Sequence, residues 1–431
     1  MFDLKKLALD VCDTLKISQK DNENIEKARN EFGSGFIDQL LQKKNFELNG
    51  FLDDELKTIE KLRHPDYGPL IYKIDNTYYT KEKVSENIRI RYVFESEECF
   101  ALAKIIREEC YRRGCTCAII PLFEGDQKEY LSMIPEDVLF ELNPMSIAIA
   151  KNMDVSIFIG DISDPNWSKG LEKKISMSSH SNMIFWGIYE KFNIRGALLA
   201  LPVERKETYV SKDKYRQVFY DSLLASFSDE MRTLIDIYEK KLKDIDTIRI
   251  VADDGTDLSF SIKDRKILRD DKYAATKKKS ETYNFPTGEV FVAPVETSAN
   301  GRIIFDYVTP RGFGLIENLD ITFKDGKVSE YTAKGDGAEK FKKFLDANTG
   351  EKDRIAELGI GCNPKAEFIG TTIVDEKIFG SIHIAIGFNL GSFQGKNQAS
   401  SHQDMIKIMK DRGGCLYADG KMIMKDGMPL D

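Results

Sequence analysis

Between residues 88 and 202, short apolar runs alternate with amphipathic segments. IRIRYVF (88–94) has an apolar residue at nearly every second position, which predicts a strand. ESEECFALAKIIREECYRRG (95–114) has an acidic start, helical apolar spacing and a closing glycine, which predict a helix. The alternation continues to a strand at RGALLALP (195–202). Because apolar strands alternating with helices form parallel sheets covered on both faces, this region predicts an α/β domain with a mainly parallel sheet.

The pattern changes near residue 246. Residues 213–245 form a long helical stretch, and short alternating runs separated by turns follow from 247 onward. KDGK (324–327) and ADGK (418–421) are two-residue Asp-Gly turns, which are typical of antiparallel hairpins. We therefore predict a helical extension over 1–85, an α/β domain with its linking helix over 86–246, and a β-rich metal-binding domain over 247–431.

Composition narrows the class of protein. With 42% hydrophobic and 31% charged residues, the chain is typical of a folded globular protein, and its net charge of −8 argues against a nucleic-acid partner. No apolar run approaches the roughly 18–20 residues that cross a bilayer, so no membrane partner is expected. The seven cysteines are an odd number in mostly apolar runs, which favours a reducing, cytoplasmic location over a disulfide framework. The α/β region contains neither GxGxxG nor GxxxxGK[ST], so nothing there predicts a nucleotide site.

Two of the four histidines fall within SIHIAIGFNLGSFQGKNQASSHQD (381–404). Strand parity places His383 on the face opposite Ile382, Ile384 and Ile386, free to project into a site. His402 and Asp404 are two positions apart, so in an extended segment they point the same way. Two histidines and a carboxylate suit zinc, manganese, cobalt or iron(II). The alternative, Asp404 bonded to a histidine that binds no metal, is commoner for an isolated His-x-Asp.

Two glutamates strengthen the metal hypothesis. Glu289 in GEVFVAP precedes an apolar run, and Glu357 in IAELGIGCNP lies between apolar residues. Burying such a carboxylate without compensation costs several kcal/mol, so each is either paired in a salt bridge or bound to a metal. Five ligands in one β domain exceed what a single zinc ion needs and suit two divalent ions.

Four blocks occur in order along the second region: PTGEVFVAPVETSANG (286–301), RIAELGIGCNP (354–364), DEKIFGSIHIAIGFN (375–389) and SHQD (401–404). Together they resemble the aminopeptidase T and aminopeptidase S family of thermophilic-type metallopeptidases. With the N-terminal α/β pattern, the resemblance covers roughly residues 85–431. It implies a homodimer that encloses a chamber for short peptides and cleaves their N-terminal peptide bond. It also implies two zinc, cobalt or manganese ions, carried over onto Glu289, Glu357, His383, His402 and Asp404.

Hydrolysis by an activated water also needs a carboxylate base, for which Glu376 is a candidate. The competing interpretation of Glu376 is a surface charge on a turn beside Lys377. The chain departs from the family pattern twice. Gly288 stands where a second acid usually precedes the glutamate, and Leu390 stands in place of a tyrosine.

Two other functions remain open at this stage. The sequence is also similar to ring-cleaving 2,5-dihydroxypyridine dioxygenases, in which one iron(II) would be held by His383, His402 and Asp404. On that hypothesis Glu289 and Glu357 support the site without binding metal. The third possibility is a non-catalytic family member that binds a metal or a partner without turnover, a reading favoured by Gly288 and Leu390.

Overall fold

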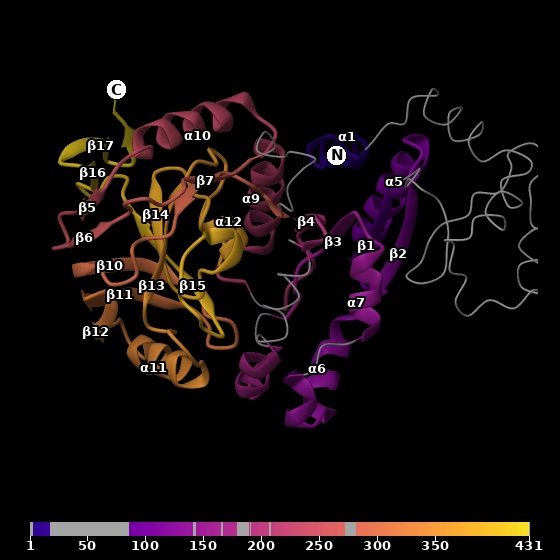
Figure 1. The fold of residues 1–431 in the computed structure, drawn as a ribbon, viewed down its shortest axis with the longest axis horizontal. Coiled ribbons are helices and arrows are strands. Elements are labelled where there is room, and N and C mark those ends of the chain that lie inside the picture. The colour runs from indigo at the N-terminus through magenta and orange to yellow at the C-terminus, as the bar shows by residue number, and fades with distance from the viewer. Residues whose placement is uncertain are drawn as a thin grey trace, which may run out of the picture.

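The computed structural model describes residues 3–17 and 86–430, except 141–143, 165–166, 179–188, 190, 207 and 272–281. Two sheets dominate the fold, with helices packed around and between them (Figure 1). The helices are α1 (Leu4–Thr14), α5 (Glu97–Arg112), α6 (Glu124–Met133), α7 (Pro144–Lys151), α9 (Lys212–Ala225), α10 (Asp229–Leu242), α11 (Gly337–Ala347) and α12 (Thr372–Asp375), with 3-10 turns η1 (Glu136–Phe140) and η2 (Gly391–Phe393).

The first sheet is parallel and five-stranded, in the order β2-β1-β3-β4-β8. Its strands are β1 (Asn87–Val93), β2 (Thr116–Leu122), β3 (Val155–Ile159), β4 (Arg195–Leu199) and β8 (Thr282–Phe285). Apolar residues of α1 and α5 share one buried core with these strands. The last strand, β8, comes from the C-terminal half of the chain, so the polypeptide returns to the first sheet before it builds the centre of the second.

The second sheet is antiparallel and strongly curled (Figure 1). Its path runs β18-β17-β16-β5-β6-β10-β15-β14-β13-β9-β7, and β11 and β12 extend it from β10. The strands are β5 (Thr247–Val251), β6 (Asp257–Ser261), β7 (Leu268–Asp270), β9 (Glu289–Val292), β10 (Asn300–Val308), β11 (Ile316–Lys324), β12 (Lys327–Thr332), β13 (Ile355–Gly361), β14 (Ser381–Gly387), β15 (His402–Ile408), β16 (Cys415–Ala418), β17 (Lys421–Lys425) and β18 (Met428–Pro429). A parallel α/β part and an antiparallel β-rich part confirm the predicted fold class.

Both Asp-Gly turns form the hairpins that the sequence predicts. Lys324 pairs with Lys327 across the first turn, and Ala418 pairs with Lys421 across the second. Asp325 and Gly326 both have positive φ values, 49° and 79°, as a type I′ turn requires.

The long helical stretch predicted over 213–245 is two helices, α9 and α10, rather than one. Ser228 separates the two helices. Its Oγ accepts a hydrogen bond from the Met231 amide, so Ser228 is the N-cap of α10. The segment between the two helices also contacts the start of the second sheet. The amide of Thr287, just before β9, donates to Ser226 Oγ at 2.9 Å. α10 then packs its apolar face on β9.

Of the helical extension predicted over 1–85, α1 is observed, and residues 18–85 lie outside the part that the structure describes. None of the seven cysteines, all of which are described, forms a disulfide. Across the described residues, no helix combines the length and the apolar character needed to span a membrane.

Candidate metal centre

Four adjacent strands carry all five predicted ligands. Glu289 begins β9, Glu357 lies on β13, His383 lies on β14, and His402 and Asp404 lie on β15. The order β15-β14-β13-β9 makes these strands direct neighbours. The opposite face of the same strands contributes apolar side chains to the core of the second sheet: Val290, Leu358, Ile360, Ile382, Ile384, Ile386 and Met405. The parity argument for His383 is therefore confirmed.

A β-bulge at Ala356 sets the direction of Glu357. The register between β13 and β14 shifts between Ile355 and Glu357, so the two residues do not follow simple alternation. Ile355 packs in the apolar core, while Glu357 points to the polar face beside His383.

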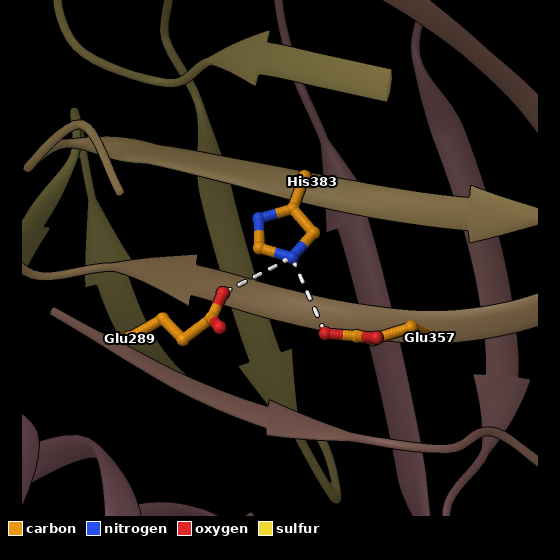
Figure 2. Close-up of side chains that lie close together, drawn as sticks. All are labelled: Glu289, Glu357 and His383. Carbon is orange, nitrogen blue, oxygen red and sulfur yellow. Dashed lines mark hydrogen bonds and ion pairs between the residues drawn. The ribbon is translucent and has the colours of Figure 1, made fainter. Parts of the chain in front are cut away.

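Glu357 lies between the two histidines. Its Oε1 is 3.4 Å from His383 Nε2, and its Oε2 is 3.2 Å from His402 Nε2. Figure 2 shows the His383 ring reaching both Glu357 and Glu289, whose Oε2 is also 3.4 Å from Nε2. Asp404 Oδ1 completes the other side, 3.3 Å from His402 Nε2. Each oxygen of the Glu357 carboxylate thus faces a different imidazole.

The remaining ring nitrogens are occupied by backbone carbonyls. His383 Nδ1 lies 3.1 Å from the Glu376 carbonyl oxygen, and His402 Nδ1 lies 2.6 Å from the Phe388 carbonyl oxygen. A carbonyl only accepts, so each Nδ1 carries the proton and each Nε2 faces the carboxylates. Metal-binding histidines have this arrangement, with the outer hydrogen bond orienting the ring. The Phe393 ring also stacks on His402, with centroids 4.9 Å apart.

The donor atoms fall into two groups that share Glu357. Glu289, Glu357 and His383 form one group, and Glu357, His402 and Asp404 form the other, with ligand atoms within 4.8 Å of one another in each. Glu289 Oε2 is buried and accepts no hydrogen bond from any described residue. Nitrogen and carboxylate donors in this arrangement fit divalent metal ions, and a shared carboxylate fits two of them.

The charges in the cluster shift its pKa values strongly. Burial lowers the pKa of His383, but the hydrogen bond to Glu357 and the charges of Glu289 and Asp404 outweigh burial and raise it to about 9. The pKa of His402 is likewise raised well above its usual range, because Asp404 and Glu357 outweigh its burial. Burial raises the pKa of Asp404, but the two imidazoles hold it well below its usual range. Protons and metal ions therefore compete for the same acidic site.

Sequence reasoning missed Lys377 and Asp270. Lys377 is fully buried, and its Nζ contacts the Glu289 carboxylate, Glu376 Oε1 at 2.8 Å and Asp270 Oδ2 at 3.5 Å. The signal was present in DEKIFGS, where a lysine follows an acidic pair and precedes a buried strand. A search for the cation that compensates Glu289 would have selected it.

Glu376 is buried beside Lys377, so its interpretation as a surface turn charge is wrong. Burial, together with the charges of Asp404 and Glu289, raises the pKa of Glu376 to about 8, against the lowering effect of Lys377. The Glu376 carboxyl group therefore lies close enough to Asp404 and Glu289, two of the predicted ligands, to be affected by their charges.

The structure also shows the surroundings of Gly288 and Leu390, the two residues that depart from the family pattern. Gly288 has φ +132°, and a Cβ there would lie 2.9 Å from both Asn363 Cβ and Met231 Sδ. An acidic side chain does not fit at this position without movement of its neighbours. Leu390 is the residue that precedes the short turn η2.

Comparisons with known proteins give one family match and two similarities of fold. Residues 227–428 match the model of the thermophilic metalloprotease (M29) family. The fold is similar to that of AmpT from Thermus thermophilus, with a TM-score of 0.63 at 18% identity over 80% of this chain and 94% of that one. It is also similar to 2,5-dihydroxypyridine dioxygenase from Pseudomonas putida KT2440, with a TM-score of 0.54 at 13% identity over 80% and 92% of the two chains. No curated protein matches the sequence.

The shared role of Glu357 predicts a specific loss of metal. Glu357→Gln removes one donor from both groups, so we expect bound metal to fall from about two ions per chain to less than one. Plasma mass spectrometry after dialysis measures this content. Glu330→Gln, at an exposed position on β12, is the matched control and should retain its metal. Equal metal content in the two variants would contradict a shared ligand.

Gly359 leaves the space that the His383 ring fills. A Cβ at 359 would lie 2.0 Å from His383 Cε1 and 2.1 Å from Nε2, so Gly359→Ala must displace the imidazole. We expect metal affinity to fall at least tenfold while the circular dichroism spectrum is retained. Gly125→Ala, where a Cβ has open space, controls for the added methyl group. Unchanged affinity in Gly359→Ala would show that His383 does not bind metal.

Metal binding should depend steeply on pH. Between pH 6 and 8 the raised pKa values keep both imidazoles protonated in chelator-treated protein, so each must lose a proton when metal binds. The logarithm of the apparent Mn²⁺ association constant should rise by up to roughly two per pH unit. Calorimetric titration in buffers of different ionisation enthalpy also counts the protons released. A flat profile would show that the imidazoles are not ligands.

Proposed function

We propose that this chain, whose residues 227–428 belong to the thermophilic metalloprotease (M29) family, is a metal-dependent aminopeptidase that removes N-terminal residues from short peptides. In this proposal, Glu289, Glu357, His383, His402 and Asp404 bind two zinc, cobalt or manganese ions. We further propose that the enzyme acts in the cytoplasm as a homodimer.

The position of Glu357 carries the proposal. Its two oxygens face different histidines. This placement suits a carboxylate that is shared by two metal ions, because each oxygen lies beside a separate group of donors. Two divalent ions bound there would lower the pKa of a water molecule and polarise the scissile carbonyl. The protein's own contribution is to hold both groups of donors rigidly on one sheet face, so that the substrate meets them in a fixed geometry.

Glu376 is the residue to which we assign proton transfer. Lys377 Nζ contacts both the Glu376 and Glu289 carboxylates, which places the proposed base next to a proposed ligand. An acidic side chain at position 288 would require its neighbours to move, so we assign the role of the second acid of the family pattern to Glu376. Divalent cations bound to Asp404 and Glu289 would offset the charges that raise the pKa of Glu376. The ionised Glu376 carboxylate would then accept a proton from the attacking water and deliver it to the leaving amine nitrogen.

The dioxygenase hypothesis uses only His383, His402 and Asp404. It gives no role to the contact of His383 with Glu289 or to the placement of Glu357 between the histidines. The fold similarity to the dioxygenase applies equally to the peptidase, so the donor set is the observation that favours hydrolysis.

Metal content and turnover together test the proposed function. Protein purified without chelator should contain two ions per chain and release leucine from leucyl dipeptides at the same rate with and without oxygen. His402→Ala should lose both properties. One iron per chain with oxygen-dependent turnover would support the dioxygenase. Full metal content without any turnover, in a screen that covers dipeptides of every residue class, would support the non-catalytic role.

Glu376→Gln should separate chemistry from metal binding. Loss of a general base lowers kcat by roughly 10²- to 10⁴-fold, and metal content should stay unchanged because Glu376 is not a ligand. The exposed Glu367, in the preceding segment, provides a matched Glu→Gln control. Wild-type kcat in Glu376→Gln would assign the proton transfer to another group.

A further inference from the structure

A cavity of about 380 Å³ lies beside the proposed metal centre. His402 and Asp404 line it, together with Glu172 and Ile175 of the N-terminal half. Ser176 Oγ donates to Ser400 Oγ at 2.7 Å at the same place, so both halves of the chain are joined at its wall. The volume is at the lower end of the range for small-molecule sites, about 300–1,000 Å³, and suits a short peptide rather than a folded protein.

Arg311 is the cationic side chain among the residues that line this cavity. No ion pair or hydrogen bond joins its guanidinium to any described residue, whereas Arg265, Arg269 and Arg302 each bind a carboxylate. Arg311 is exposed, so its guanidinium is accessible from the cavity. An accessible guanidinium without a partner among the described residues can form a charge-assisted pair with an anion that arrives with the ligand.

The loop that carries Arg311 is fixed in place. The Phe313 amide donates to the Pro310 carbonyl at 3.0 Å, which closes a turn around Arg311 and Gly312. The Phe313 ring packs edge-on against Phe344 at 6.1 Å between centroids. A Cβ at Gly312 would lie 2.7 Å from Ser168 Oγ, so the loop also lies directly against the N-terminal half. The backbone at Arg311 is therefore fixed before a ligand binds, so no entropy is lost in ordering this loop on binding.

The cavity lining combines groups that suit both charged ends of a short peptide. His402 and Asp404 belong to the predicted ligand set, and the loop that follows β10 contributes Arg311. Thr309, Asn348, Ser401 and Gln403 add hydroxyl and amide groups that can bind peptide bonds. A short peptide carries an amine at one end and a carboxylate at the other.

We propose that Arg311 binds a carboxylate of the peptide substrate and so makes the enzyme selective for short peptides with an anionic group beyond the scissile bond. This inference rests on the proposed aminopeptidase function. Two sources supply the same chemistry, the C-terminal carboxylate of a dipeptide and an acidic side chain at the second residue. A guanidinium–carboxylate pair is planar and bidentate, so lysine is an imperfect substitute.

Four substrates separate these sources: Leu-Gly, Leu-Gly-amide, Leu-Asp-amide and Leu-Asn-amide. We expect wild-type kcat/KM to be roughly tenfold to a hundredfold higher for one carboxylate-bearing substrate than for its matched amide. Preference for Leu-Gly over Leu-Gly-amide assigns the C-terminal carboxylate, and preference for Leu-Asp-amide over Leu-Asn-amide assigns the side chain. Arg311→Gln should abolish the preference and leave amide hydrolysis within about twofold, and Arg311→Lys should restore part of it. Arg249→Gln, which removes an exposed arginine paired with Asp257 on β6, is the matched control.

Binding measured without turnover keeps this inference separate from the proposed function. A phosphinic analogue of Leu-Gly and its C-terminal amide can be titrated calorimetrically into metal-loaded wild-type protein and Arg311→Gln. A carboxylate preference that is lost in Arg311→Gln supports the inference even if no peptide is hydrolysed, a result that would overturn only the aminopeptidase. Equal effects of Arg311→Gln on acid and amide ligands, or no effect on either, would overturn the role of Arg311.

Discussion

The excess of buried negative charge on one face of the second sheet is the constraint on which the site depends. Five carboxylates lie on or next to this face: Asp270, Glu289, Glu357, Glu376 and Asp404. Among the described residues, Lys377 is the buried cation that contacts three of them, at a position sealed from solvent. Each uncompensated carboxylate would cost several kcal/mol. The two divalent ions of the proposed function would balance that charge and would couple metal binding to the stability of the fold.

The sheet positions the five predicted ligands with little freedom. Antiparallel pairing fixes the offset between strands, so Glu289 faces Gly361, and His383 faces Gly359. Glycine at 359 leaves the space for the imidazole, which a methyl group would occupy. The isoleucines of β14 bury the opposite face in the core. A change of one residue in register would exchange the two faces, so the apolar core and the polar site specify the same alignment.

The strands of the second sheet do not form this site alone. The break between α9 and α10 presents Ser226 to Thr287, and Asn363 Nδ2 donates to the Ser222 and Thr287 carbonyls at 2.9 Å. These contacts hold the turn before Glu289 against α9 and the segment that follows it. The cavity beside His402 is also lined by Glu172 and Ile175, so the N-terminal half of the chain limits the space within it.

The sequence by itself determined the fold class, both Asp-Gly hairpins and the face of His383, because these follow from local turn chemistry and from side-chain periodicity. It also selected five residues that the structure brings together. Only the tertiary structure decided the bulge at Ala356 and the burial of Glu376. It alone placed Lys377 among the carboxylates and Arg311 in the cavity. These features depend on contacts between segments far apart in the chain, which no local pattern of polar and apolar residues encodes.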